Sequence, residues 1–282
     1  MATPKVADLR IATVQFESIS GDKAANLATI ARFAASAASH HCHVVAFHEC
    51  CIPGYTFATR LSRAALLAVA EPVPSGASTQ ALISIARRHN ILILAGFYER
   101  DEDDDGSGSN VIYNTYVCVS GDGLLARFRK LHPFISPHLR AGRELVVFDL
   151  LGWKAGILIC YDNNVVENVR ATALLGAEVL FAPHVTMCTP SARPGAGFVD
   201  TALNPIGMDD DQLKNGCSMV LDPFGDVLAE CRVLGEDMAV AVCTRDKLQK
   251  AGGFRYRQAR RPEIYGEILG REHDSQLKVA WM

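Results

Sequence analysis

The sequence predicts a layered α/β domain, and three observations indicate it. Strand-like apolar runs and helix-like amphipathic runs alternate through the first half of the chain. Near the middle, a strand, a sharp turn, a helix and another strand follow one another. The chain has 282 residues, of which 49% are hydrophobic and 21% charged, which is enough apolar material for one large core. We therefore predict a single layered domain rather than a barrel or bundle built from one type of element.

The first half supplies three predicted strands and two predicted helices. The β-rich runs are 9–16, 44–47 and 91–97. Asp22 can cap the first helix, whose apolar face carries Leu27, Ile30, Ala31 and Ala34. Ser78 can cap the second helix, which Asn90 ends and whose apolar face carries Leu82, Ile85 and Ala86.

Two further strands, 111–119 and 124–128, form a predicted hairpin after a polar loop at 101–109. The loop matches the early positions of an EF-hand calcium loop, with Asp101, Asp103, Asp105 and Gly106. The twelfth position should be a bidentate Glu and is Ile112, and the flanking segments are strands rather than helices. We interpret the loop as a solvated hairpin tip.

The apolar run 155–159 leads directly into Cys160, and a predicted helix opens a few residues later. Asn164 and Glu167 can form a capping box for this helix, which ends before a further strand at 178–182. Backbone N–H groups and the positive end of the helix dipole favour a thiolate there, so Cys160 is a candidate nucleophile. The alternative is an ordinary buried cysteine, and on position alone the two interpretations weigh about equally.

The second half is less regular. Residues 184–216 are rich in Thr, Pro, Gly and Asp and sustain no helical period. Strand pairing is predicted to resume in three segments, 217–222, 227–229 and 238–242. The tail from Ala251 carries an arginine cluster, Arg255, Arg257, Arg260 and Arg261, which we interpret as a solvated or subunit-contact surface.

Charge and cysteine content narrow the class of protein. The net charge of −3 gives no general attraction for nucleic acid or an anionic membrane, so small-molecule chemistry is expected. The nine cysteines lack the spacing of a secreted disulfide framework and indicate a reducing compartment. The first residues show no signal-peptide pattern, and no apolar run reaches the roughly 18 residues of a membrane span. We expect a soluble cytoplasmic protein.

Two ionisable residues stand, like Cys160, where apolar strands end. They are Glu49, after the run 44–48, and Lys130, after the second strand of the hairpin. A surface ion pair would explain either residue alone. Together, in the order Glu, Lys, Cys and with their flanking segments, they resemble the nitrilase superfamily of carbon–nitrogen hydrolases. The matching segments are 44–49 with 53–55, 113–115 with 129–132, 156–162, 176–180, 204–207 and 217–225.

The resemblance implies a four-layer αββα sandwich formed by one domain over residues 1–282, with a tail from about 251 to 282 as a candidate oligomer contact. It implies a covalent mechanism in which Glu49 is the general base, Cys160 attacks the substrate carbon, and Lys130 stabilises negative charge on oxygen. It also implies a homo-oligomer that needs no metal or organic cofactor. The N–H of Tyr161 is a second candidate donor to the oxyanion.

The resemblance also suggests substrate-binding or supporting residues and a substrate class. His184 is a candidate for the rim of the pocket, and Tyr55 and Asn114 are candidate supports, with simple packing as the alternative. Nitrile-cleaving members tend to follow the nucleophile with Trp-Glu, whereas Tyr161-Asp162 resembles the amidase and carbamoyl-hydrolysing branches. An amide or N-carbamoyl substrate is therefore favoured over a nitrile.

The chain departs from the family pattern in two places. Relatives usually carry a crossover helix and a strand before the Asn-Pro-Ile-Gly element, but here 199–203 runs directly into Asn204 without room for about a dozen crossover residues. We predict that one βα element of the second half is missing. Many relatives also place a second Glu after the lysine, and here His138 and Glu144 are the candidates to replace it.

Histidines and cysteines gather around the second predicted strand and resemble a metal site. Strand alternation splits this apparent metal cluster between two faces without a zinc-like spacing, so we interpret it as packing: His40, His41, Cys42, His43, His48, Cys50 and Cys51.

Two alternative functions are a catalytically inactive nitrilase-like binding or scaffold protein, whose pocket the missing element has destroyed, and a true nitrilase. A third, nucleic-acid binding by the arginine cluster, is not expected of an acidic chain.

Overall fold

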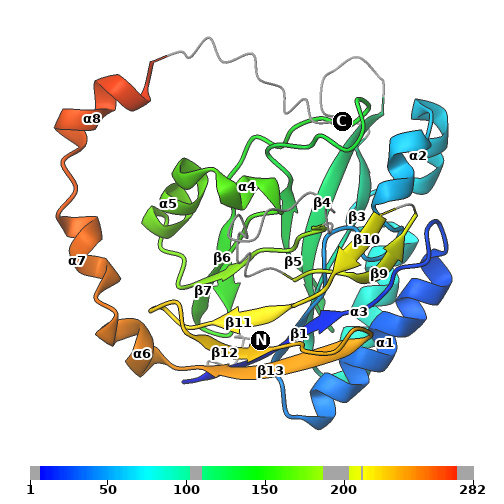
Figure 1. Ribbon diagram of the computed structural model, residues 1–282, viewed down its shortest axis with the longest axis horizontal. Helices are drawn as coiled ribbons and strands as arrows, with labels where there is room; N and C mark the ends of the chain where they lie inside the picture. Colours follow the sequence, from blue (N-terminus) through cyan, green and yellow to red (C-terminus); the bar gives the residue numbers. More distant parts are fainter. Residues whose placement is uncertain (1–6, 102–109, 187–202, 211, 272–282) are drawn as a thin grey trace.

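The computed structural model describes residues 7–101, 110–186, 203–210 and 212–271, and their elements are drawn in Figure 1. The strands are β1 (Leu9–Gln15), β2 (Val44–Ala46), β3 (Leu92–Asp101), β4 (Val111–Ser120), β5 (Gly123–Arg129), β6 (Val147–Leu150), β7 (Trp153–Ile157), β8 (Val179–Phe181), β9 (Ile206–Asp209), β10 (Gln212–Asn215), β11 (Met219–Leu221), β12 (Val227–Glu230) and β13 (Asp237–Cys243). The helices are α1 (Lys23–Ser39), the 3₁₀ helix η1 (Thr56–Arg60), α2 (Arg63–Val69), α3 (Ala77–His89), α4 (Tyr161–Asn164), α5 (Val166–Leu174), α6 (Arg245–Lys250), α7 (Gly253–Gln258) and α8 (Pro262–Leu269).

A six-stranded mixed sheet with the order β13-β1-β2-β3-β4-β5 organises the first half of the chain. β1, β2 and β3 are parallel, with Ile11 opposite Val44 and Val44 opposite Leu92. β4 and β5 continue the sheet as antiparallel hairpins, as the sequence predicts. At the other edge β1 pairs antiparallel with β13, so the first and last described strands close on each other. The ends of β2 and β5 carry Glu49 and Lys130 toward the site.

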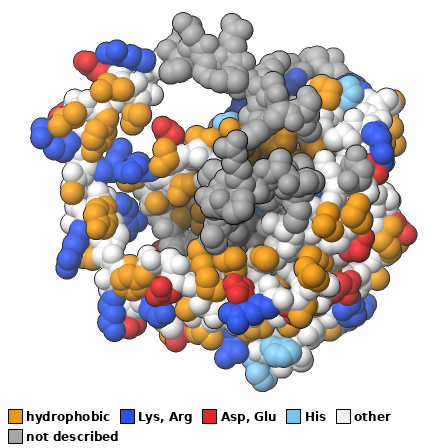
Figure 2. Space-filling view, viewed as in Figure 1, with side chains coloured by type: hydrophobic (Ala, Val, Ile, Leu, Met, Phe, Trp, Pro, Cys, Tyr) orange, Lys and Arg blue, Asp and Glu red, His pale blue; other side chains and the backbone are white. Residues whose placement is uncertain are grey.

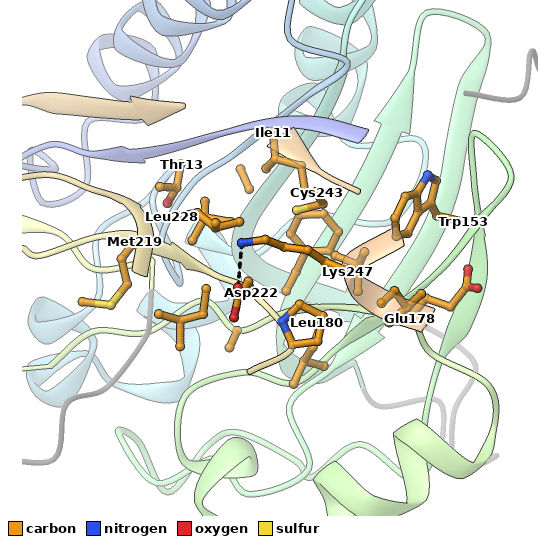
Figure 3. A pocket seen from close by; sticks show the side chains of 18 of the residues that line it. Ile11, Thr13, Trp153, Glu178, Leu180, Met219, Asp222, Leu228, Cys243 and Lys247 are labelled. Carbon is orange, nitrogen blue, oxygen red and sulfur yellow. Dashed lines mark hydrogen bonds and ion pairs between the residues drawn. The ribbon is translucent and has the colours of Figure 1, made fainter. Parts of the chain in front are cut away.

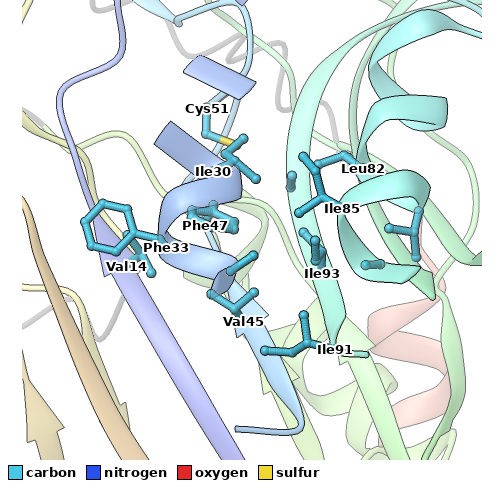
Figure 4. Close-up of a cluster of buried hydrophobic side chains, with 14 of the residues drawn as sticks. Val14, Ile30, Phe33, Val45, Phe47, Cys51, Leu82, Ile85, Ile91 and Ile93 are labelled. Atoms are coloured by element: carbon cyan, nitrogen blue, oxygen red, sulfur yellow. The ribbon is translucent and has the colours of Figure 1, made fainter. Parts of the chain in front are cut away.

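Helices α1 and α3 cover one face of this sheet and bury an apolar cluster against it (Figure 4). Strand alternation explains the cluster, because Ala12, Val14 and Phe16 point toward the helices while Leu9 and Ile11 point to the opposite face. Helix α1 begins as predicted, with the Asp22 carboxylate accepting from the N–H of Ala25 at 3.0 Å.

The opposite face of the six-stranded sheet packs on a second sheet, β6-β7-β8, in which β7 and β8 are parallel. Helix α5 covers the outer face of β7, where a Cβ added to Gly156 would lie 2.5 Å from Cγ2 of Thr172. The layers therefore run helix, sheet, sheet, helix. This arrangement confirms the predicted four-layer αββα sandwich.

Two predicted helix caps are wrong. The N-cap of α3 is Gly76 rather than Ser78, and Ser78 lies inside the helix, where its N–H and hydroxyl donate to the Glu71 carboxylate. The Glu71 carboxylate, which lies outside the helix, therefore takes the place of an N-cap side chain as the hydrogen-bond acceptor. Asn164 does not cap the second-half helix either, because it belongs to the short helix α4 and Val165 is the N-cap of α5. The sequence pattern also missed the strand β6 and helix α2, and the hairpin β9–β10.

The predicted missing βα element falls between Ala182 and Asn204, and residues 187–202 lie outside the described residues, as do residues 102–109 of the acidic loop. Leu203 forms a parallel bridge with Pro183, so it lies beside the end of β8. The N–H of Leu203 donates to the carbonyl of Ala182, and the N–H of His184 donates to the carbonyl of Leu203. The loss of a βα element stays a prediction.

Beyond β13 the chain continues as the helices α6, α7 and α8, which run along the outside of the sandwich (Figure 1). Neither α7 nor α8 has a buried residue. Figure 2 shows apolar and basic side chains next to one another along this outlying segment. Among the helices of the described residues, none combines the length and apolarity that crossing a bilayer requires.

Candidate active site

Glu49 follows β2 and lies in the interior of the molecule. Its N–H faces the carbonyl of His184 at 3.4 Å, which ties the end of β2 to the segment after β8. The N–H of Phe47 donates to the carbonyl of Leu94 at 3.0 Å and extends the pairing of β2 with β3. The buried backbone thus fixes where the Glu49 side chain starts.

Lys130 and Glu49 form an ion pair that is completely buried. The ammonium Nζ of Lys130 lies 2.7 Å from Oε1 of Glu49, and both side chains are 0% exposed. The amide Nδ2 of Asn114 donates to the same oxygen at 2.6 Å. Oε1 therefore has two donors, whereas Oε2 is buried and has no hydrogen-bond partner among the described residues. The carboxylate has one oxygen held in place and one left for chemistry.

The charge of Lys130 is stabilised by its surroundings. Burial by itself lowers the pKa of an ammonium, but the charges of Glu49 and Cys160 oppose that effect, and the pKa of Lys130 is raised above its ordinary value. The ammonium also lies 4.9 Å from the ring centre of Phe134 and 5.7 Å from that of Tyr55. Lys130 therefore stays cationic at neutral pH.

Cys160 occupies a sharp turn between β7 and α4. Its φ of 52° and ψ of −110° lie in a region that residues with a Cβ rarely adopt. The turn is held by hydrogen bonds from the N–H of Cys160 to the carbonyl of Pro183 and from the N–H of Asn163 to the carbonyl of Cys160. The strained turn at the end of a strand presents the thiol at the start of a helix, where the sequence predicted it.

Asp162 joins the Cys160 turn to the segment after Lys130. Its buried carboxylate accepts from the N–H of Leu131 at 3.1 Å, from the N–H and ring Nδ1 of His132 at 2.8 and 2.9 Å, and from the N–H of Ile159 at 3.3 Å. Because these donors belong to two segments about 30 residues apart, one carboxylate fixes both. In the sequence Asp162 indicated only a substrate class, and no local pattern predicted that its carboxylate joins these two segments.

Asp162 is a second carboxylate whose charge acts on Lys130. Its charge, after those of Glu49 and Cys160, contributes to the raised pKa of Lys130. The sequence had suggested His138 or Glu144 for this position. Glu144 instead lines a polar cavity with Arg127 and Arg129, and the N–H of His138 donates to the hydroxyl of Ser136.

The remaining predicted residues lie around the ion pair. Tyr55 is buried, and burial and then the charges of Glu49 and Cys160 raise the pKa of its hydroxyl, which places its ring near both groups. Tyr161 begins α4, and its ring makes an edge contact with Phe134. His184 is buried and meets Glu49 through its backbone carbonyl rather than at an exposed rim.

Cys160 differs from most other cysteines in its accessibility. It is half-buried, as is Cys243, whereas five other cysteines of the described residues are buried: Cys42, Cys50, Cys51, Cys118 and Cys231. Cys217 is exposed and belongs to the segment before β11. The cysteine beside Lys130 is thus reachable from solvent, as a nucleophile has to be.

The histidines and cysteines around β2 have structural partners. Nδ1 of His43 faces the N–H of Arg10 at 3.0 Å, and His48 is buried between Ser18 and the carbonyl of Glu49. In the described part of the chain no group of three or more His, Cys, Asp or Glu side chains could hold a metal ion.

A cavity of about 340 Å³ lies between the two sheets, away from the ion pair (Figure 3). Its walls come from β1, β8, β11 and α6, with an ion pair between Lys247 and Asp222 at 2.8 Å. Glu49, Lys130 and Cys160 are not among the residues that line it. The candidate active site is therefore defined by the side chains around Lys130 rather than by this larger space.

The fold and this arrangement define a class of protein. Residues 10–252 match the model of the carbon–nitrogen hydrolase family, and the chain belongs to that family. The match covers every segment that carries the site.

Individual relatives agree with this assignment. The chain is 30% identical over 235 residues to an (R)-stereoselective amidase of a Pseudomonas species, covering 79% of this chain and 80% of that protein. It is 25% identical over 301 aligned positions to the N-carbamoylputrescine amidase of Solanum lycopersicum, covering 95% of this chain and 97% of that enzyme. Among solved structures, a double variant of the amidase from Nesterenkonia sp. AN1 in complex with acrylamide is similar in fold, with a TM-score of 0.72 and 20% identity over 95% of this chain and 100% of that one.

Proposed function

We propose that the chain hydrolyses the C–N bond of an amide or N-carbamoyl compound through a thioester on Cys160. The observation that carries the proposal is the buried ammonium of Lys130, which is bonded to Glu49 at 2.7 Å and whose pKa is raised by the charge of Glu49 and then by that of Cys160. A base, a cation and a thiol that act on one another are the set that nucleophilic acyl transfer requires, and this supports the proposal.

In the first half of the reaction, Oε2 of Glu49 accepts the proton of the Cys160 thiol, because Oε1 already has two donors. The thiolate adds to the carbonyl carbon of the substrate. Negative charge develops on the carbonyl oxygen, which the ammonium of Lys130 and the N–H of Tyr161 stabilise; one such donor is worth about 3–4 kcal/mol. The C–N bond breaks, the protonated Glu49 gives its proton to the nitrogen, and ammonia or an amine leaves.

In the second half, water adds to the thioester carbon and Glu49 accepts one of its protons. The C–S bond breaks, the carboxylic or carbamic acid leaves, and the proton returns from Glu49 to the sulfur. The names of the amidase relatives support an amide or N-carbamoyl substrate. Asp162 supports this substrate class only through the family resemblance, since its carboxylate already accepts hydrogen bonds from backbone N–H groups.

The direct test measures release of ammonia from a panel of short amides and N-carbamoyl compounds. We expect wild type and Cys217→Ala to release ammonia at the same rate and Cys160→Ala to release none, since the charge of Cys160 acts on Lys130 whereas Cys217 is an exposed cysteine of another segment. A nitrile in the panel tests the alternative substrate class. Equal rates for wild type and Cys160→Ala would overturn the mechanism.

A thiol-labelling experiment separates the enzyme from an inactive binding or scaffold protein. Alkylation is followed residue by residue with peptide mapping, because Cys217 is exposed and would dominate a bulk measurement. Rapid labelling of Cys160 near neutral pH, with little dependence on pH, supports the enzyme. Labelling slower than that of Cys217 supports the inactive protein.

We further propose that the outlying helices α7 and α8 contact a second copy of the chain. In α8, Ile264 is 51% exposed, Ile268 63% and Leu269 62%, and an apolar helix face of this kind is costly in water. Light scattering should find an oligomer for wild type and a smaller species for the Ile264→Asp/Ile268→Asp variant. An unchanged mass would remove these helices from the contact.

A further inference from the structure

A second, much smaller cavity lies directly against the candidate base. It measures about 10 Å³, which is the space that the centre of one water molecule needs. Its walls include Glu49, Tyr55, His48 and Ser18, and from the β9–β10 hairpin Asp209. Tyr55 is also near Cys160, because burial, the charge of Glu49 and then the charge of Cys160 raise the pKa of its hydroxyl.

Two of the residues that line this cavity each have a buried carboxylate oxygen without a donor among the described residues. Oε2 of Glu49 and Oδ1 of Asp209 are both buried, and neither has a hydrogen-bond partner among the described residues. Both residues line the same small space. A buried carboxylate oxygen requires a donor, so the space calls for a molecule that donates in two directions.

The other oxygen of each carboxylate is already held. Oε1 of Glu49 accepts from Lys130 and Asn114. Oδ2 of Asp209 accepts from the N–H and the hydroxyl of Thr56 at 3.0 and 2.8 Å, and the ammonium of Lys214 lies 3.8 Å away. Each carboxylate is thus fixed in orientation, and each has a lysine as its counter-charge. The two remaining oxygens are presented by groups that cannot turn away.

We propose that one water molecule binds between Oε2 of Glu49 and Oδ1 of Asp209 and is the nucleophile that hydrolyses the thioester. Water fits because it has two O–H donors and because the space holds a single molecule of its size. This inference rests on the proposed function, and it makes Asp209 a positioning residue for the second half of the reaction.

The bound water loses one of its two protons as it attacks and keeps the other. One O–H of the water donates to Asp209 and stays bonded, which points a lone pair of the oxygen away from that carboxylate. The other proton passes to Oε2 of Glu49 as the oxygen adds to the thioester carbon. When the C–S bond breaks, Glu49 returns this proton to the sulfur of Cys160, and the acid leaves.

Asp209→Asn changes the site in a defined way. The two donors of Thr56 select an acceptor, so the amide oxygen takes the place of Oδ2 and the NH₂ group takes the place of Oδ1. The water then meets a donor where it had an acceptor. Asp210→Asn is the matched control, because it removes the same charge one residue away, where Asp210 pairs with Arg60 at the surface.

The experiment feeds an amide substrate to each variant, with and without hydroxylamine, which attacks the thioester without help from the bound water. For Asp209→Asn we expect an unchanged first turnover of ammonia and an accumulated acyl-enzyme in the intact mass. We also expect acid formation to be slower by at least about tenfold, with hydroxamate formation close to that of wild type. Asp210→Asn should behave as wild type. Hydroxamate formation also shows that the variant is folded.

Acid formation at the wild-type rate in Asp209→Asn, without an accumulated acyl-enzyme, would overturn the inference. A high-resolution crystal structure of the wild type gives an independent readout, because density for a water within about 3.2 Å of both oxygens is required, and its absence would also overturn the inference. If no amide yields ammonia or an acyl-enzyme, the proposed function fails, and the crystal structure still decides the water site separately.

Discussion

Replacing Lys130 by Met should destabilise the fold more than most single substitutions in this chain. Met retains the length of the Lys130 stem beside Phe134 and removes only the ammonium, so Glu49 keeps a charge that is 0% exposed and loses its counter-ion. At an effective dielectric constant of about 20, unit charges 2.7 Å apart attract by roughly 6 kcal/mol, an upper bound for what is lost. Breaking a buried pair typically costs about 3–5 kcal/mol, and we expect a loss in that range.

A double-mutant cycle separates this effect from lost packing. Glu49→Gln alone leaves Lys130 buried and charged, whereas Glu49→Gln/Lys130→Met removes both charges, so the double variant should be more stable than the sum of the single losses by at least about 1.5 kcal/mol. Equilibrium urea unfolding measures all four proteins. Lys154→Met is the control, since Lys154 is 55% exposed, lies 3.9 Å from Asp149 and should change stability by under about 0.5 kcal/mol. A loss below about 1 kcal/mol for Lys130→Met, or strict additivity, would refute the buried pair.

Three further changes test other parts of the structure by the same unfolding measurement. Burial lowers the pKa of His48 to about 4, so between pH 6.5 and 4 the imidazole takes up a proton only in the unfolded chain. The free energy of unfolding should therefore fall by up to about 3 kcal/mol over this pH range. An equally steep fall in the His48→Gln variant would contradict this. Gly156→Ala brings a Cβ to 2.5 Å from Thr172 and should cost about 1–3 kcal/mol, of which Thr172→Ser should restore part if the clash is the cause. Asp162→Asn turns an NH₂ group toward backbone donors and should cost about 2 kcal/mol, and a loss below about 0.5 kcal/mol would show that the carboxylate does not hold the two segments.

The sequence was most informative where local pattern and packing agree. The strands at 9–16 and 111–119 lie within one residue of β1 and β4, because their apolar residues fit a sheet buried on both faces. The cap at Asp22 was also predictable, since the side chain bonds a helix N–H three residues away. The cap at Ser78 failed for the opposite reason: Glu71, from outside the helix, competes for the same donors.

The residues of the candidate site also divide into those that the sequence predicted and those that it could not predict. The positions of Glu49, Lys130 and Cys160 at strand ends could be read from the sequence, and the resemblance gave their order. Asp162 and Asp209 could not be assigned, because their partners lie about 30 and 150 residues away and only the folded chain brings them together. A carboxylate that binds backbone N–H groups of another segment leaves no local pattern in the sequence.

The geometry also bears on the predicted loss of a βα element. Among the described residues β8 is the last strand of its three-stranded sheet, and the 340 Å³ cavity lies between it and β11. The N–H of Lys130 donates to the carbonyl of Asn114, the N–H of the next residue, Leu131, donates to Asp162, and neither acceptor belongs to β8 or β11. The N–H groups of Cys160 and Glu49 donate to the carbonyls of Pro183 and His184 and connect the site to that edge. A missing element would therefore lower the stability of the second sheet while leaving the contact between Lys130 and Glu49 in place, because these two residues follow β5 and β2 of the six-stranded sheet.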